Sequence, residues 1–246
     1  MREKAARGDV GAGALTVPTT PDLWHHYGRD RATRDRAVPR AFRWDWAQAG
    51  GPGAEVLGDL GGRVVAELGA GAGRHAAHLA AHHDPAEVVA VDASPAQHAL
   101  AGSLYGHLAP RLRSVHAGAV EHLLGRAGAY DVLYSVFGAV DFTEPHTLLP
   151  AVRAALRPGG RLVFSTLAHH VGGAPARLEV TATEIPARTP GGAVVSMRRW
   201  VLAESVWATT LEQAGFTGVR TEVLPAAGDR EHAAGTLLVT AFRAAG

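Results

Sequence analysis

The chain contains no cysteine among its 246 residues. A protein without cysteine forms no disulfide, has no thiol nucleophile and cannot bind zinc through sulfur ligands. Its chemistry is compatible with a reducing compartment, and we expect a cytoplasmic location. The spacing of His, Asp and Glu suggests no metal centre either, because His75 and His78 stand three residues apart without further ligands.

Long apolar runs and an excess of one charge are also missing. No run of about 18 apolar residues occurs, as a membrane-spanning helix requires, and charges and glycines interrupt the first 22 residues, so we expect no export signal. The formal net charge of +1 produces no field that favours nucleic acid or an anionic membrane. We therefore expect neither as a partner, whereas a homo-oligomer is possible.

The composition changes along the chain and indicates its organisation. Residues 1–22 are small, Gly-rich and Pro-containing, so they predict a flexible tail. Residues 23–62 hold Trp24, Trp44 and Trp46, and we expect one or two short helices there. The remainder, residues 63–246, is predicted to form the main domain.

A regular alternation of apolar and amphipathic runs begins at residue 64. Amphipathic stretches predict helices at 73–83, 95–101 and 146–156. Continuous apolar strands alternating with helices indicate a parallel sheet covered on both faces, so the fold class is α/β, Rossmann-like and doubly wound. The five apolar runs that predict strands are Val64–Leu68, Val88–Val91, Leu112–His116, Val132–Val136 and Arg161–Leu167.

The rhythm changes near the end of the chain. A helical stretch at 203–216 precedes two apolar runs, at 218–224 and 234–244, with no helix between them. Strands joined in this way pair antiparallel, because a parallel return needs a crossover of about a dozen residues. We therefore expect a seven-stranded, mostly parallel sheet with an antiparallel last strand. The irregular stretch 168–201 follows the fifth strand, at the edge where such sheets bind ligands, and predicts a cover over the substrate.

The stretch VVAELGAGAGRHAAHLA passes from a strand through closely spaced glycines into a helix. Gly69, Gly71 and Gly73 permit positive φ angles and let a ligand approach the main chain without meeting a Cβ atom. The start of the helix adds unpaired N–H groups that carry a partial positive charge. The six residues from Gly71 satisfy the dinucleotide pattern G-x-G-x-x-G/A, but that pattern starts too late for its first glycine to close the strand.

An acidic residue precedes these glycines and changes the interpretation. Glu67 completes the pattern E-x-G-x-G-x-G, which resembles the first motif of the class I S-adenosylmethionine-dependent methyltransferases. A carboxylate here would repel a pyrophosphate but suits a ligand with an ammonium and a sulfonium group. The resemblance covers about residues 63–244, through LRPGGRLVFS and LEQAGF. It implies S-adenosylmethionine as cofactor, and a nicotinamide-dependent oxidoreductase is the less favoured alternative.

The resemblance also implies where the cofactor is held. Asp92 ends the second strand, where a carboxylate accepts the ribose hydroxyls, although it competes with Ser94 as a cap of the next helix. The family's acid after the third strand is missing, so the backbone of 118–120 or the side chain of Glu121 is expected at the adenine. The cofactor-binding residues that we expect are Tyr27, Glu67, Gly69, Ala70, Gly71, Gly73, Asp92, Ala93, Gln97, Gly118, Ala119, Val120, Ser135 and Val136.

The acceptor side is less defined. The run SVFG after the fourth strand is not the N/D-P-P-Y/F/W run of nucleic-acid amino methyltransferases, which disfavours a base-modifying enzyme. Methyl transfer is an in-line displacement that depends mainly on alignment. His169 and His170 follow the fifth strand and are candidate catalytic bases. In related small-molecule enzymes the segment before the domain folds over the cofactor as a lid, which we expect of residues 23–62.

The sequence thus predicts an enzyme that transfers a methyl group to an O, N or C atom of a small molecule, a secondary metabolite in natural product biosynthesis. One alternative keeps the fold and the cofactor but catalyses a cyclisation without methyl transfer. Another is a binding or scaffold protein without catalysis.

Overall fold

The computed structural model describes residues 22–27, 36–226 and 234–246. Its body is a seven-stranded sheet in the order β3-β2-β1-β4-β5-β9-β8. The first five strands along the chain run parallel, and β9 pairs antiparallel with both β5 and β8, which confirms the predicted fold class. The strands are β1 (Val64–Leu68), β2 (Glu87–Asp92), β3 (Leu112–His116), β4 (Tyr130–Val136), β5 (Leu156–Leu167), β8 (Phe216–Leu224) and β9 (Thr236–Arg243).

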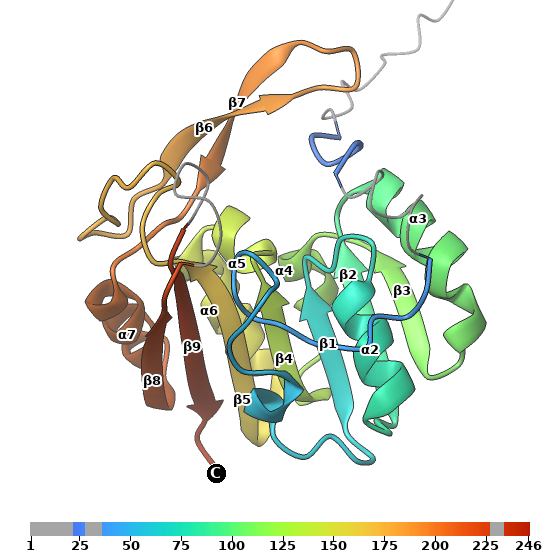
Figure 1. The fold of residues 1–246 in the computed structure, drawn as a ribbon. Helices are drawn as coiled ribbons and strands as arrows, with labels where there is room; N and C mark the ends of the chain where they lie inside the picture. Colours follow the sequence, from blue (N-terminus) through green and yellow to red (C-terminus); the bar gives the residue numbers. More distant parts are fainter. Residues whose placement is uncertain (1–21, 28–35, 227–233) are drawn as a thin grey trace, which may run out of the picture.

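Helices cover both faces of this sheet (Figure 1). They are η1 (Ala54–Leu57), α2 (Arg74–His82), α3 (Pro95–Tyr105), η2 (Gly106–Leu108), α4 (Ala119–Leu123), α5 (Ala139–Phe142), α6 (Pro145–Ala155) and α7 (Glu204–Gln213). One apolar core joins the sheet to α4, α6 and α7, around Trp207 and Phe164. The other joins it to α2, α3 and the segment before β1, around Trp44 and Tyr134. Burying each such large side chain contributes roughly 1.5–3 kcal/mol or more.

The order of the strands reverses beside β1. From β1 the chain continues outward through β2 and β3, and it then returns to β4 on the other side of β1. The carboxyl ends of β1 and β4 therefore form the switch point at which open α/β sheets bind ligands. Two glycines let the loops after these strands meet closely: a Cβ on Gly69 would lie 2.2 Å from the amide nitrogen of Ala139, and one on Gly138 would lie 2.6 Å from the carbonyl oxygen of Gly69.

The stretch between β5 and α7 contains an antiparallel hairpin, β6 (Thr183–Arg188) and β7 (Val194–Arg199), which projects beyond the carboxyl edge of the sheet (Figure 1). The sequence predicted only an irregular cover here. Gly192, with φ of +85°, helps to form the turn between the strands. Every second residue of the hairpin is half-buried, and that face includes Ile185 and Met197, which pair across the strands.

The described part of the N-terminal segment contains one short helical element. In its described part, residues 23–27 form turns and residues 36–53 are irregular, and η1 is a single 3-10 turn. Phe42 and Trp44 are both buried, and this spacing of two is the period of extended chain, not of a helix. Residues 28–35 of this segment, and all of the predicted tail except residue 22, lie outside the described residues.

Candidate active site

The glycine loop has the backbone that the sequence predicted. Gly69, Gly71 and Gly73 have φ angles of +76°, +54° and +75°, in the left-handed region that disfavours side chains. The amides of Gly69 and Ala70 both donate to the carbonyl of Val91, each at 2.9 Å, which ties the loop to β2. Gly73 directly precedes α2, so the first amides of that helix belong to the loop.

Asp92 joins the glycine loop to the start of α3. Its Oδ2 accepts a hydrogen bond from the amide of Gly71 at 2.7 Å, and its Oδ1 accepts one from the amide of Ser94 at 2.8 Å. Burial raises the pKa of Asp92, the two backbone hydrogen bonds lower it, and the charges of Glu67 and Asp22 raise it further. Ser94 takes the cap role, because its hydroxyl accepts from the amide of Gln97.

Glu67 is buried and is bonded to protein groups. Its Oε2 accepts hydrogen bonds from the amide of Ala76 and the hydroxyl of Tyr134, both at 3.1 Å. Its Oε1 lies 3.4 Å from Nδ1 of His75. These bonds aim the carboxylate at the first turn of α2 and at β4.

A short N-terminal segment, residues 22–27, lies across the first turn of α3; we call it the strap (blue in Figure 1). Oδ2 of Asp22 accepts hydrogen bonds from the hydroxyl of Ser94 at 2.8 Å and from the amide of Ala96 at 3.2 Å. No local pattern of the sequence points to Asp22, because its partners are more than 70 residues away along the chain.

The strap makes two further contacts with the body of the protein. Nε2 of Gln97 donates to the carbonyls of Trp24, at 2.8 Å, and Tyr27, at 2.7 Å. The ring of Trp24 meets the ring of Phe142 edge to face, with centroids 4.7 Å apart. Tyr27 therefore contacts Gln97 through its backbone carbonyl, whereas the residue itself is 60% exposed.

The turn expected at the adenine leads from β3 into α4. The side chain of Glu121 reaches back to the start of its own helix, where Oε2 accepts from the amide of Gly118 at 3.4 Å. Ala119 and Val120 form the first turn of that helix. His116, which the sequence analysis did not single out, places Nε2 at 3.1 Å from the carbonyl of Ala93 and so joins this turn to the end of β2.

The end of β4 is rigidly held. The hydroxyl of Ser135 is buried; it donates to the carbonyl of Leu68 at 2.8 Å and accepts from the amide of Val140 at 3.4 Å. Half-buried Val136 precedes Phe137, which has a φ of +47°, a strained value for this residue type that costs of order 1–3 kcal/mol. The ring of Phe137 contacts Trp46 at a centroid distance of 5.0 Å.

The base of the hairpin is attached to α5 by a buried ion pair. Nη2 and Nε of Arg199 donate to Oδ2 of Asp141, at 2.5 Å and 3.0 Å. The guanidinium also stands 5.4 Å from the ring centre of Trp46 and 5.3 Å from that of Phe142. Burial raises the pKa of Asp141 above its usual value, although the nearby Arg199 opposes this rise.

The two candidate bases have different surroundings. Both ring nitrogens of His169 have backbone partners: Nδ1 lies 3.0 Å from the carbonyl of His170, and Nε2 accepts from the amide of Gly235 at 3.0 Å. Nε2 of His170 lies 3.5 Å from the hydroxyl of Thr183. Burial lowers the pKa of His170, and the charges of Arg177 and Arg199 lower it further.

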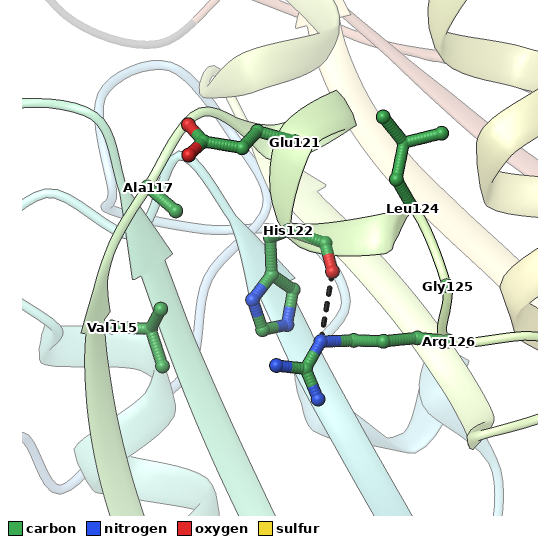
Figure 2. Close-up of a pocket in the computed structure, with 7 residues that line it drawn as sticks. All are labelled: Val115, Ala117, Glu121, His122, Leu124, Gly125 and Arg126. Carbon is green, nitrogen blue, oxygen red and sulfur yellow. Dashed lines mark hydrogen bonds between the residues drawn. The ribbon is translucent and has the colours of Figure 1, made fainter.

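A surface depression of about 440 Å³ lies beside α4, on the segment between β3 and β4 (Figure 2). Its lining includes Ala117, Glu121 and His122, and Arg126 bonds the carbonyl of His122 there. Nε2 of His122 lies 2.7 Å from the hydroxyl of Tyr130. Burial, with the charges of nearby arginines, lowers the pKa of His122 to about 4.

The described residues contain neither a cluster of metal ligands nor a helix suited to a membrane. Among residues 22–27, 36–226 and 234–246, no three His, Asp or Glu side chains come together as metal ligands would. No helix in that part of the chain combines the length and the apolar character that a membrane crossing requires.

The fold and the loop geometry are those that the sequence predicted from its resemblance to the class I S-adenosylmethionine-dependent methyltransferases. Residues 65–160 match the family model of the methyltransferase domain. Residues 65–160 therefore form a methyltransferase domain, which supports S-adenosylmethionine as the cofactor. The residues fit that cofactor, because the loop offers left-handed glycines without Cβ atoms. The carboxylates of Glu67 and Asp22 also lie close enough to Asp92 to raise its pKa, so three acidic groups gather beside the loop.

Solved structures with the same fold include several methyltransferases. The chain resembles an S-adenosylmethionine-dependent methyltransferase from Mesorhizobium loti at 21% identity and a TM-score of 0.56, covering 76% of this chain and 94% of that one. It resembles the 1,6-didemethyltoxoflavin-N1-methyltransferase of Burkholderia thailandensis at 24% identity and a TM-score of 0.53, covering 78% and 74%. The (4+2)-cyclase SpnF shares 19% identity with a TM-score of 0.56, covering 78% and 79%. No curated protein matches the sequence.

Proposed function

We propose that this methyltransferase acts on a small organic molecule and methylates an oxygen, nitrogen or carbon atom of it, as in natural product biosynthesis. The observation that carries the proposal is the convergence of three separate segments on the residues that follow β4. The strap contacts Phe142 through Trp24, the segment before β1 contacts Phe137 through Trp46, and the hairpin contacts Asp141 through Arg199. A site covered from several sides suits a small acceptor better than a long polymer.

The cofactor supplies an electrophilic methyl group when it is bound. We propose that it is held by the residues expected from the sequence, with Gly69, Gly71 and Gly73 under its amino-acid part and Asp92 at its ribose. The residues that follow β4 would exclude water from the reacting atoms, since partly buried aromatic rings surround them. The N-terminal strap would act as the lid over this site.

We propose His170 as the base for an acceptor that must lose a proton. The lowered pKa of His170 keeps its imidazole neutral at pH 7, and a neutral imidazole can accept a proton. His170 also stands next to Thr183, which pairs with Arg199 at the base of the hairpin. His169 suits this role less well, because both of its ring nitrogens are occupied by backbone groups.

The proposal is tested by incubating the protein with S-adenosylmethionine and a library of small aromatic, polyketide-like and amine acceptors, with tRNA and DNA as controls. We expect S-adenosylhomocysteine to form with a small acceptor whose mass increases by one methyl group. Formation only with the nucleic acids would contradict a small-molecule acceptor.

A non-methylating cyclisation is the second candidate, since a protein named as a cyclase is among the structures of the same fold. In that reaction the substrate would isomerise and S-adenosylmethionine would be recovered unchanged. Mass spectrometry of substrate and cofactor in one reaction separates the two candidates.

A further inference from the structure

Gln97 connects two parts of the site. Its side chain is 2% exposed, and its Nε2 donates to two carbonyls of the strap, those of Trp24 and Tyr27. Two carbonyl acceptors can be satisfied only by the amide nitrogen, so the orientation of the Gln97 amide is fixed by its partners. The oxygen of the amide must then point away from the strap.

That oxygen has no partner among the described residues. Oε1 of Gln97 is buried and accepts no hydrogen bond, although a buried acceptor without a donor costs free energy. It lies 3.6 Å from the position that a Cβ on Gly71 would take, so it faces the glycine loop. The backbone amide of Gly71 is already bonded to Asp92. No described residue therefore supplies the missing donor, and a bound ligand beside the loop would supply it.

We propose that Oε1 of Gln97 accepts a hydrogen bond from a ribose hydroxyl of the bound cofactor, while Nε2 keeps its bonds to the strap. Asp92 is the neighbouring acceptor at the same loop, and a ribose offers two hydroxyl donors. Gln97 is thus a positioning residue that links the cofactor to the seating of residues 22–27. The inference rests on the cofactor of the proposed function and is independent of the acceptor.

This arrangement makes the coupling between cofactor binding and the seating of the strap reciprocal. A cofactor that orders the amide of Gln97 also orders the two strap carbonyls bonded to it, and a seated strap prepares the amide for the cofactor. Asp22 adds to the seating, because its carboxylate bonds the first turn of the same helix. S-adenosylhomocysteine carries the same ribose and binds without turnover, so it is the suitable probe.

Two variants separate the role of the amide oxygen of Gln97 from that of its amide nitrogen. Gln97→Glu keeps an acceptor toward the ligand but loses the N–H donors to the strap, whereas Gln97→Leu loses both. Gln213→Leu, at an exposed position at the end of α7, is the matched control. Titration calorimetry with S-adenosylhomocysteine gives the dissociation constant, and hydrogen exchange of the peptide containing residues 22–27 reports the seating of the strap.

In the unmodified protein and in Gln213→Leu we expect the ligand to slow exchange of the strap. Gln97→Glu is expected to bind within about threefold of the unmodified protein but to lose the slowed exchange. Gln97→Leu is expected to bind at least tenfold more weakly. Unchanged affinity in Gln97→Leu, or slowed exchange retained in Gln97→Glu, would overturn the inference. If Gln97→Leu fails to fold, the exchange measurement on Gln97→Glu alone decides whether the inference holds. If the unmodified protein does not bind S-adenosylhomocysteine, the cofactor assignment on which the inference rests is overturned instead.

Discussion

The carboxylate of Asp92 and the backbone amide of Gly71 are joined by a hydrogen bond of 2.7 Å. This bond connects the end of β2 to the glycine loop that follows β1. It places a carboxylate acceptor beside a glycine-rich loop, which is the combination that binds a ribose next to the main chain in such sheets. The hydrogen bond therefore fixes the position of the loop relative to the acid.

Replacing Asp92 with Ala should weaken binding of S-adenosylhomocysteine by about 1.5 to 3 kcal/mol, because a charge-assisted acceptor for sugar hydroxyls is lost. Titration calorimetry checks this expectation. Asp84→Ala is the control, since Asp84 is exposed and pairs only with Arg111 on the surface. Equal affinity in the two variants would reduce Asp92 to a structural bond of the loop.

Replacing Gly69 with Ala should destabilise the protein by about 2 to 4 kcal/mol. The new Cβ would lie 2.2 Å from the amide nitrogen of Ala139, and the φ of +76° disfavours any side chain. Gly102→Ala provides the contrast within α3, where nothing lies within 4 Å, and should stabilise the protein by roughly 0.5 to 1 kcal/mol. Urea unfolding measures both, and similar midpoints for the two variants would contradict the close contact of the loops.

Replacing Arg199 with Met should cost about 3 to 5 kcal/mol, because the buried carboxylate of Asp141 loses its partner. The loss should be smaller at pH 5 than at pH 8. Without Arg199 the pKa of Asp141 rises further above its unfolded value, and such a group stabilises the folded state as the pH falls. Adding Asp141→Asn should recover part of the stability. A single variant that loses less than about 1 kcal/mol at pH 8 would show that the pair contributes little to holding the hairpin.

Stability should decline as the pH falls from 6.5 to about 4, in part through His122. Its pKa is lowered to about 4 in the folded protein, so the unfolded chain binds the proton first and its protonation favours unfolding. The contribution is at most about 3 kcal/mol. Urea unfolding of His122→Gln across this range should show a flatter dependence than the unmodified protein, whereas the exposed His107→Gln should not. An unchanged slope in His122→Gln would exclude this residue as the cause.

Local patterns were sufficient for the parallel part of the sheet. The bounds of β1 and β3 agree with the predicted ranges, and β1 is buried in the middle of the sheet, where a strand covered on both faces is mostly apolar. The start of β5 differs from the prediction. The strand begins at Leu156 instead of Arg161, because Leu156 pairs with Tyr130 of β4 before a shift in register. That shift depends on the neighbouring strand and leaves no signal within β5 itself.

The residues of the candidate site also fall into those that the sequence predicted and those that only the structure shows. The sequence by itself determined the glycine loop and the acid that ends β2. Positive φ angles and a carboxylate at a strand end both depend on residues that are neighbours in the chain. Only the tertiary structure decided which groups close the site. Asp22 meets Ser94, and Arg199 meets Asp141, across 72 and 58 residues of chain. Contacts at that separation depend on how the whole sheet brings distant loops to one edge, which no local spacing of residues records.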